Sequence, residues 1–291
     1  MKRLLLVALA VGLVVNGCAK KEAFVKADVN HVKAQLAKLA PVELGAEVDR
    51  LPPQRQELVK KLVQASRLMD EIFLRQVYAK NLEIRDWLRR SKDPNDKIYL
   101  EYFTIMFGPF DRLDDDKPFI GTEPKPLGAN FYPEDMTKEE FFDWIKAHPE
   151  DKEAFESNFT VIRRQNGRLV AIPYSQAYRE LLEPAAKLLK EAAALADNAS
   201  LKRYLQTRAD AFLSNDYFES DMAWMDLDDP DIEVVIGPYE VYEDRLLSYK
   251  ASFESFVTLV DREESEKLAR VARYLNAMEK NLPYPDKYKN L

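Results

Sequence analysis

The chain has 291 residues, 46% of them hydrophobic and 32% charged, which predicts a core-forming protein of one large domain or two ordinary ones. Its formal net charge of −7 argues against nucleic acid as a main partner, because phosphate binding requires a basic face. The 8 glycines form neither a G-x-G-x-x-G nor a P-loop pattern, so no phosphate-cradling loop is expected.

The first residues have the pattern of a secretory signal peptide. Two basic residues precede an apolar run from Leu4 to Val15, which is too short to span a bilayer as a stable helix. The run ends in Val-Asn-Gly before Cys18, which resembles the bacterial lipobox, where the cysteine is lipidated and becomes the first mature residue. We therefore expect residues 1–17 to be a signal peptide and acyl chains on Cys18 to hold the protein to a membrane.

This interpretation of Cys18 places the protein in the bacterial cell envelope, lipid-anchored and facing the periplasm or the exterior. Cys18 is the only cysteine, so its lipidation leaves no thiol for a disulfide bond, a catalytic nucleophile or a metal. An ordinary signal peptide with an incidental cysteine, or an uncleaved anchor, is the alternative.

The first half of the chain reads as mostly helical. Residues 18–55 are polar and predict a tether with a short helix. From Gln56 to Arg90 apolar residues recur at helical spacing, which predicts one long or two consecutive amphipathic helices. The aromatic-rich residues 98–110 are expected in the core, and residues 111–133 form an irregular segment whose acidic triplet, 114–116, is a solvated loop.

Two local signals in the middle of the chain are sharper. Thr137 with Glu140 forms a capping box, and the helix it begins should end near His148, before a proline. Residues 159–174 predict a β-hairpin, because two short apolar strands flank Asn166-Gly167, the dipeptide that type I′ turns prefer.

Helices and a strand pair follow. A helix over 175–197 is expected to be interrupted or kinked at Pro184, and a second helix covers 200–214. An acidic run then contains Trp224 and Met225, which we expect as core anchors. Strands are predicted around 232–242 and 253–260, and Asp261 with Glu264 predicts the start of a last helix that reaches about Asn281.

The strand region carries the polar residues Glu240, Tyr242 and Asp244 at alternate positions. In an extended chain, residues two apart share a face. The spacing therefore predicts two carboxylates and a phenol on one face, which could form a polar cluster at the wall of a cleft. A solvated strand face explains the same spacing, and on spacing alone it is the simpler interpretation.

The sequence contains no self-sufficient catalytic motif. Zinc hydrolases use two or three His or Glu ligands, whereas this chain has only His31 and His148, without a His-Glu-x-x-His pattern. Neither a G-x-S-x-G motif nor a free cysteine indicates a nucleophile. Acidic residues abound, but nothing marks a glycosidase pair. We therefore predict no catalytic residue and no metal ligand in this chain.

Five segments of the chain carry a family resemblance: EVYED at 240–244, FESFV at 253–257, LPYP at 282–285, ANFYPEDMT at 129–137 and SDMAWM at 220–225. The first three resemble segments of the dipeptidyl-peptidase III family of zinc metallopeptidases, and the last two resemble its bacterial lipoprotein branch. The resemblance extends over residues 56–291 and identifies them as the first-half, N-terminal region of that family.

The resemblance implies a two-lobed peptidase that removes dipeptides from peptide N-termini. Its fold would be α+β, mostly helical with a small antiparallel sheet or barrel core shared by the two β regions. The family's glutamate and tyrosine that hold the substrate's free amine fall on Glu240 and Tyr242, so peptides with a free N-terminus are the expected ligands. A carboxylate pairs with an ammonium, and a phenol can hydrogen-bond beside it.

The family's zinc motif, and two asparagines that complete its amine clamp, have no counterpart in the printed sequence. We therefore expect the chain to be inactive as a peptidase by itself, because a metal-activated water is the nucleophile. A truncated gene, or a split gene whose zinc-bearing half is encoded separately, fits this expectation. The alternatives are a non-catalytic, lipid-anchored peptide-binding or scaffold lipoprotein and a plain structural lipoprotein.

Overall fold

The computed structural model of the protein describes residues 24–290, so Cys18 and the expected signal peptide lie outside the described residues. Within that range no helix combines the length and the apolar character that crossing a bilayer requires. The elements, in chain order, are α1 (Val29–Leu36), α2 (Pro53–Val77), α3 (Asn81–Arg90), α4 (Asp96–Met106), β1 (Phe110–Asp111), β2 (Lys117–Pro118), α5 (Lys138–Ala147), α6 (Lys152–Glu156), β3 (Thr160–Gln165), β4 (Arg168–Pro173), α7 (Tyr174–Ala177), α8 (Arg179–Leu195), α9 (Ala199–Ser214), α10 (Phe218–Met225), β5 (Ile232–Glu240), β6 (Ser252–Leu259), α11 (Arg262–Ala272) and α12 (Leu275–Lys280), with short 3₁₀ turns at Val48–Arg50, Pro149–Asp151 and Asp286–Tyr288.

Helix α2 is the central support of the molecule. It begins with Pro53 at its first position, where proline costs no intrahelical hydrogen bond, and it ends where Tyr78 takes an extended conformation. Buried apolar residues recur every three or four positions from Leu58 to Val77, while Val63 is exposed. The sequence predicted one long or two consecutive helices here, and α2 followed by α3 confirms the second form.

Two hydrophobic cores meet on α2. The larger core packs the first two-thirds of the helix, from Leu58 to Ile72, against α8, α9 and the β5–β6 hairpin. The smaller core packs Leu74 and Val77 against α1, α3 and α4. The aromatic residues predicted as core between positions 98 and 110 are in this smaller core, with Tyr102 and Phe103 fully buried.

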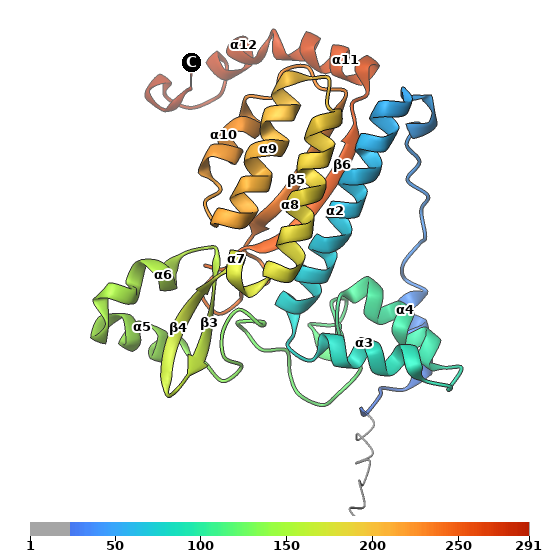
Figure 1. Ribbon diagram of the computed structural model, residues 1–291, viewed down its shortest axis with the longest axis vertical. Helices are drawn as coiled ribbons and strands as arrows, with labels where there is room; N and C mark the ends of the chain where they lie inside the picture. Colours follow the sequence, from blue (N-terminus) through green and yellow to red (C-terminus); the bar gives the residue numbers. More distant parts are fainter. Residues whose placement is uncertain (1–23, 291) are drawn as a thin grey trace, which may run out of the picture.

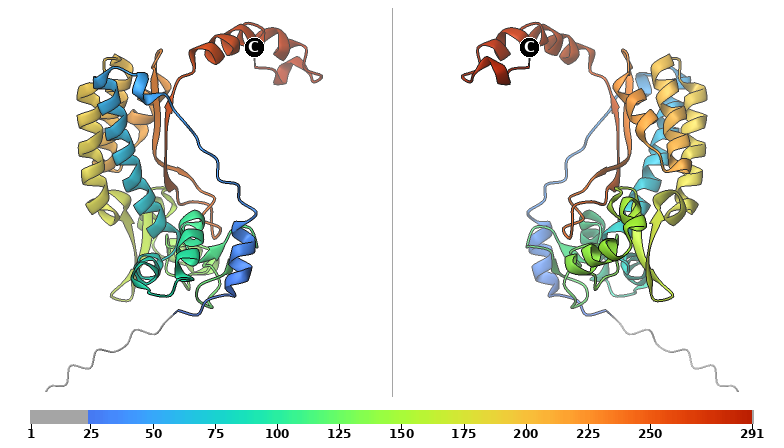
Figure 2. Two further views of the ribbon diagram at one scale, coloured as in Figure 1. Left: turned by 90° about the vertical axis from the view of Figure 1, so that its right-hand side faces the viewer. Right: turned by 90° about the vertical axis from the view of Figure 1, so that its left-hand side faces the viewer.

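The β5–β6 hairpin has one covered face and one open face. Helices α2, α8 and α9 lie side by side against one face (Figure 1), and Figure 2 shows the opposite face without a helix over it. Residues Ile232, Val234 and Ile236 point into the core, while Phe256 on the open face is 59% exposed. Helices α11 and α12 form an arm that projects from the top of the hairpin on the side of its open face (Figure 2).

The 159–174 hairpin is confirmed as β3 and β4, which pair antiparallel from Thr160↔Pro173 to Gln165↔Arg168. Asn166 and Gly167 both have positive φ, 50° and 78°, as a type I′ turn requires.

The two β regions do not share a sheet, so that part of the prediction was wrong. The hairpins β3–β4 and β5–β6 form separate two-stranded sheets. Strand β3 packs near α6 and α7, while β5 and β6 pack on α2, so different helices separate them. The predicted mixture of many helices with small antiparallel sheets is confirmed, but no closed barrel is formed within the described residues.

The predicted helix caps are present. Thr137 accepts a hydrogen bond from the backbone N–H of Glu140 at 3.1 Å, and α5 ends at His148. Asp261 accepts from the N–H of Glu264 at 3.1 Å and starts α11. The last helical segment is divided, because the turn between α11 and α12 interrupts it near Tyr274.

Three local expectations were wrong. The helix is not interrupted at Pro184, which lies inside α8; the break falls at Tyr178, between α7 and α8, where the Tyr178 ring packs 5.3 Å from the Tyr174 ring. Met225 ends the unpredicted helix α10 and is 71% exposed. Asp116 of the acidic triplet is buried and pairs with Arg245 at 2.7 Å, so it is not solvated.

Candidate functional site

The three polar residues singled out in the strand region do not share one face. Strand β5 ends at Glu240, which is exposed and pairs with Ser252 of β6. Tyr242 lies beyond the strand in a loop and is 80% exposed, whereas Asp244 is fully buried. The expectation of a common face was wrong because the chain stops being extended after Glu240.

Glu240 and Tyr242 nevertheless meet at one pocket of about 280 Å³ beside the lower end of the hairpin. The pocket lies between α2, the end of α4 and the open face of β6. It is lined by Asp70, Phe73, Phe107, Glu240, Tyr242, Glu243, Ser252, Phe253, Glu254 and Ser255.

The pocket holds more negative charge than its surroundings neutralise. Glu243 is compensated, because Arg112 donates two hydrogen bonds to it at 3.0 and 3.2 Å and Lys125 pairs with it as well. The other carboxylates, Asp70, Glu240 and Glu254, form no ion pair with the described residues.

Two of these carboxylates, Glu254 and Asp70, have raised pKa values. Burial, and then the charge of Glu240, raises the pKa of Glu254 above its ordinary value. Burial, and then the charge of Glu71, raises the pKa of Asp70. Like charges and desolvation both disfavour the ionised form of a carboxyl group. A cation that binds in the pocket would therefore stabilise the ionised carboxylates.

Aromatic rings form the apolar wall of the pocket. Phe73 of α2 and Phe107 meet edge to face, with ring centroids 5.1 Å apart, and the Arg112 guanidinium lies 5.9 Å from the Phe73 centroid. Phe107 ends α4 in the left-handed conformation, with φ 54°. Three carboxylates beside an aromatic wall suit a ligand that joins an ammonium to an apolar side chain.

Asp244 anchors the loop that carries Tyr242. Its two carboxylate oxygens accept hydrogen bonds from the Tyr132 hydroxyl at 2.8 Å and from four backbone N–H groups of the same loop, at residues 246, 247, 249 and 250. Each lone pair of this buried charge therefore has a donor, as burial of a carboxylate requires. The loop is closed by local bonds, so Tyr242 is held beside the pocket although it is exposed.

The buried Lys250 fixes the end of the same loop. Its ammonium donates to the carbonyl oxygens of Phe155 and Ser157 at 2.6 and 2.7 Å and to Thr160 Oγ1 at 2.9 Å. Burial lowers the pKa of Lys250 to about 7. Because its three donors are occupied by the β3 side of the molecule, Lys250 joins the loop to that region and is not free to act in the pocket.

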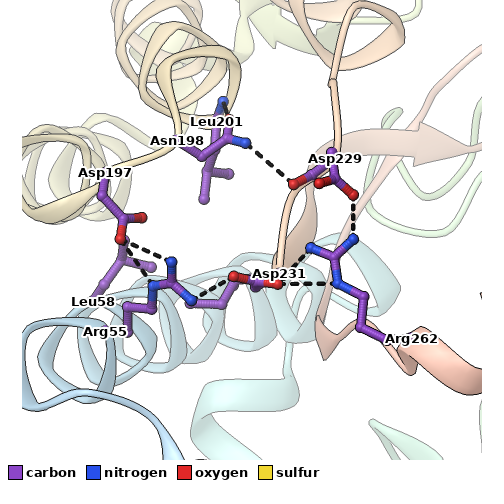
Figure 3. A pocket seen from close by; sticks show the side chains of 9 residues that line it. Arg55, Leu58, Asp197, Asn198, Leu201, Asp229, Asp231 and Arg262 are labelled. Carbon is purple, nitrogen blue, oxygen red and sulfur yellow. Dashed lines mark hydrogen bonds and ion pairs between the residues drawn. The ribbon is translucent and has the colours of Figure 1, made fainter.

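A second pocket, of about 370 Å³, lies at the opposite end of the hairpin, at the root of the arm. Each of its charged residues has an ion-pair partner (Figure 3): Arg55 pairs with Asp197 and Asp231, and Arg262 pairs with Asp229 and Asp231. These contacts join α2, the α8–α9 loop, β5 and α11. We interpret these ion pairs as a structural link that fixes the arm, because every charged residue in the pocket already has a partner.

The described residues also contain one group whose ligand atoms converge, His31, Asp111 and Asp114, all within 4.8 Å of one another. Asp111 already accepts hydrogen bonds from Tyr102, from Gln35 and from a backbone N–H. Asp114 pairs with a neighbouring lysine at 2.9 Å. A hydrolytic zinc needs free donors and an open position for water, so this group does not fit one.

Comparison with known proteins identifies the family. A model of peptidase family M49 matches residues 137–290, just over half of the chain. The chain belongs to peptidase family M49. The matched region contains Glu240 and Tyr242 and the loop between β5 and β6.

Two solved M49 structures are close to this one. DPP III from Caldithrix abyssi is 63% identical, with a TM-score of 0.85, over 89% of this chain and 49% of that chain. Dipeptidyl-peptidase III from Corallococcus sp. strain EGB is 43% identical, with a TM-score of 0.83, over 91% of this chain and 50% of that chain. These matches confirm the predicted resemblance to the dipeptidyl-peptidase III family.

A plant protein named Nudix hydrolase 3, from Arabidopsis thaliana, is 35% identical over 311 residues, which cover 89% of this chain and 40% of that protein. The chain therefore spans about half the length of the solved M49 structures and less than half of the plant protein.

Sequence reasoning missed most of the pocket. Glu254 lies in the quoted FESFV segment, and its register opposite Gly237 places it on the open face, but the register was not recognised. Asp70 and Phe73 are on α2, where their spacing fits an ordinary helix and gave no signal. Phe107 was predicted only as core.

We predict that Glu254→Gln stabilises the fold near neutral pH. The pKa of Glu254 is raised in the folded protein, so the stability gained by protonation is present below the unfolded value and is lost as the pH rises through the folded value. Removing the charge should raise the free energy of unfolding in neutral urea titrations, and the gain should disappear at about pH 4 or below.

Glu233→Gln is the matched control for this experiment, because Glu233 is on the same hairpin but does not line the pocket. It should not produce the same pH-dependent gain. Equal or lower stability of Glu254→Gln at neutral pH would contradict the crowding of carboxylates.

Proposed function

We propose that this M49 chain provides the substrate-amine site of a metallo-dipeptidyl-peptidase. In this proposal the ammonium at the N-terminus of a peptide enters the pocket at the lower end of β5 and is held by Glu240, with Tyr242 beside it. The observation that supports the proposal is the set of three carboxylates without an ion-pair partner next to an aromatic wall.

The chemistry of the pocket selects for a free amino terminus. An ammonium donates up to three charge-assisted hydrogen bonds, and the Glu240 carboxylate accepts them. The aromatic rings of Phe73 and Phe107 would contact the apolar part of the first residues. Fixing the amine at one place lets the peptide be measured from its end, which a dipeptidyl-peptidase requires.

We further propose that hydrolysis depends on a zinc-bearing half that is not contained in the printed sequence. Zinc would supply the activated water, and the described residues do not offer it a fitting donor set. The arm supports the proposal, because five apolar residues on one side of it are more than half exposed: Leu268, Val271, Tyr274, Leu275 and Met278. Such a surface normally packs against another part of a protein.

Replacement of Glu240 tests the amine site. Glu240→Gln keeps the size of the side chain and removes its charge, so binding of the pentapeptide leucyl-tetra-alanine, measured by isothermal calorimetry, should weaken by about tenfold or more. Glu233→Gln should bind like the wild type. Unchanged affinity of Glu240→Gln would contradict a role of Glu240 in binding the amine.

A hydrolysis assay complements the titration. Peptide binding without hydrolysis would agree both with an amine site that awaits its metal half and with a lipid-anchored peptide-binding lipoprotein. Hydrolysis of a dipeptidyl-naphthylamide by the purified chain, with stoichiometric bound zinc, would overturn the proposal that it is inactive alone.

We also propose that Cys18 is lipidated and holds the protein to the bacterial envelope. The proposal rests on the lipobox-like sequence before Cys18. In a bacterial host, the wild type should incorporate labelled palmitate and partition into the membrane fraction, and Cys18→Ser should do neither. Equal partition of the two forms, with no label in either, would contradict it.

A further inference from the structure

A register shift in the β5–β6 hairpin decides where Glu240 points. Up to Pro238 the strands pair regularly, but Pro238 opposes Phe253 while Glu240 opposes Ser252. Tyr239 is therefore an extra residue, a β-bulge. Without it Glu240 would fall on the covered face and oppose Ala251, which is buried. With the bulge, Glu240 lies on the open face of the hairpin, beside the acidic pocket lined by Asp70, Glu240 and Glu254.

One buried arginine contacts the bulge. Arg208 of α9 has no exposed surface, and its guanidinium lies 5.3 Å from the centroid of the Tyr239 ring. The rings of Tyr204 and Tyr217 lie 5.6 and 5.3 Å from the same guanidinium. Three tyrosines thus surround a cation at the distances of cation–π attraction.

Gly237 leaves the room that this contact needs. Its φ is +151°, a conformation that residues with a side chain rarely adopt. A Cβ atom added there would lie 2.8 Å from Arg208 Nη1. The strand therefore comes close to the guanidinium at Gly237, two residues before the bulge and three before Glu240.

The charge of Arg208 is poorly compensated for a buried group. It donates one side-chain hydrogen bond, from Nη2 to Asp221, while Nε and Nη1 have no partner among the described residues. Burying such a group costs free energy, and apolar residues of similar size often leave stability unchanged or higher. Ion pairing and hydrogen bonding alone therefore give no reason for an arginine at this position.

We propose that Arg208 is a positioning residue for the amine site. It holds Tyr239 in the bulge through its cation–π contact, and the bulge in turn aims Glu240 at the acidic pocket. This inference rests on the proposed amine-binding function, but the local effect on the strand can be measured independently of it.

Arg208→Met tests the proposal, because methionine replaces the charge with an apolar chain. The free energy of unfolding should be unchanged or higher, while the affinity for leucyl-tetra-alanine should fall by about tenfold. Amide hydrogen exchange of residues 238–242 should become faster while exchange in α9 stays the same. Arg208→Lys, which retains the cation, should recover part of the affinity.

Arg203→Met is the matched control. Arg203 is on the same helix, is exposed and pairs with Glu219 of α10 and with Asp226, which follows that helix. Its removal should leave peptide affinity and exchange at 238–242 unchanged.

A second variant keeps the proposal testable if Arg208→Met does not fold. Tyr239→Leu removes the ring from the other side of the contact and should produce the same faster exchange and weaker binding. Unchanged exchange at 238–242 in a folded Arg208→Met or Tyr239→Leu protein would overturn the positioning role. Faster exchange there, in a chain whose wild type binds no peptide, would uphold it and reject the amine-binding function.

Discussion

The covered and open faces of the β5–β6 hairpin are the constraint on which the site depends. Helices α2, α8 and α9 cover one face, so strand alternation sends every second residue into the core. Ile232, Val234 and Ile236 follow this rule. The bulge at Tyr239 breaks it one residue before the charged Glu240 and transfers that side chain to the open face.

The uncompensated carboxylates of the pocket destabilise the folded protein. Burial and neighbouring carboxylates raise the pKa values of Glu254 and Asp70. The ionised forms of these two side chains are therefore disfavoured in the folded protein. Other carboxylates are closely compensated: Asp244 accepts five hydrogen bonds, and every carboxylate in the pocket at the root of the arm has an ion-pair partner. The contrast marks the pocket as the place where a cationic group is expected.

Local sequence signals predicted the helices and the turns well. Capping at Thr137 and Asp261 and the Asn166-Gly167 turn depend on a few neighbouring residues, so the chain shows them directly. The pocket depends on contacts that sequence spacing does not reveal. Asp70 and Glu254 line the same pocket only because α2 packs along β6, and the direction of Glu240 depends on a register shift of one residue. The proposed amine site therefore rests on the resemblance to a family and not on alternation, which placed Asp244 on the wrong face.

The central claim is that this M49 chain recognises the free amino terminus of a peptide. The most direct test is a calorimetric titration of the wild-type protein with leucyl-tetra-alanine and with the same peptide acetylated at its N-terminus. Acetylation removes the ammonium and leaves the apolar contacts, so the account predicts that affinity falls by about tenfold or more. Equal affinity for the two peptides would contradict it.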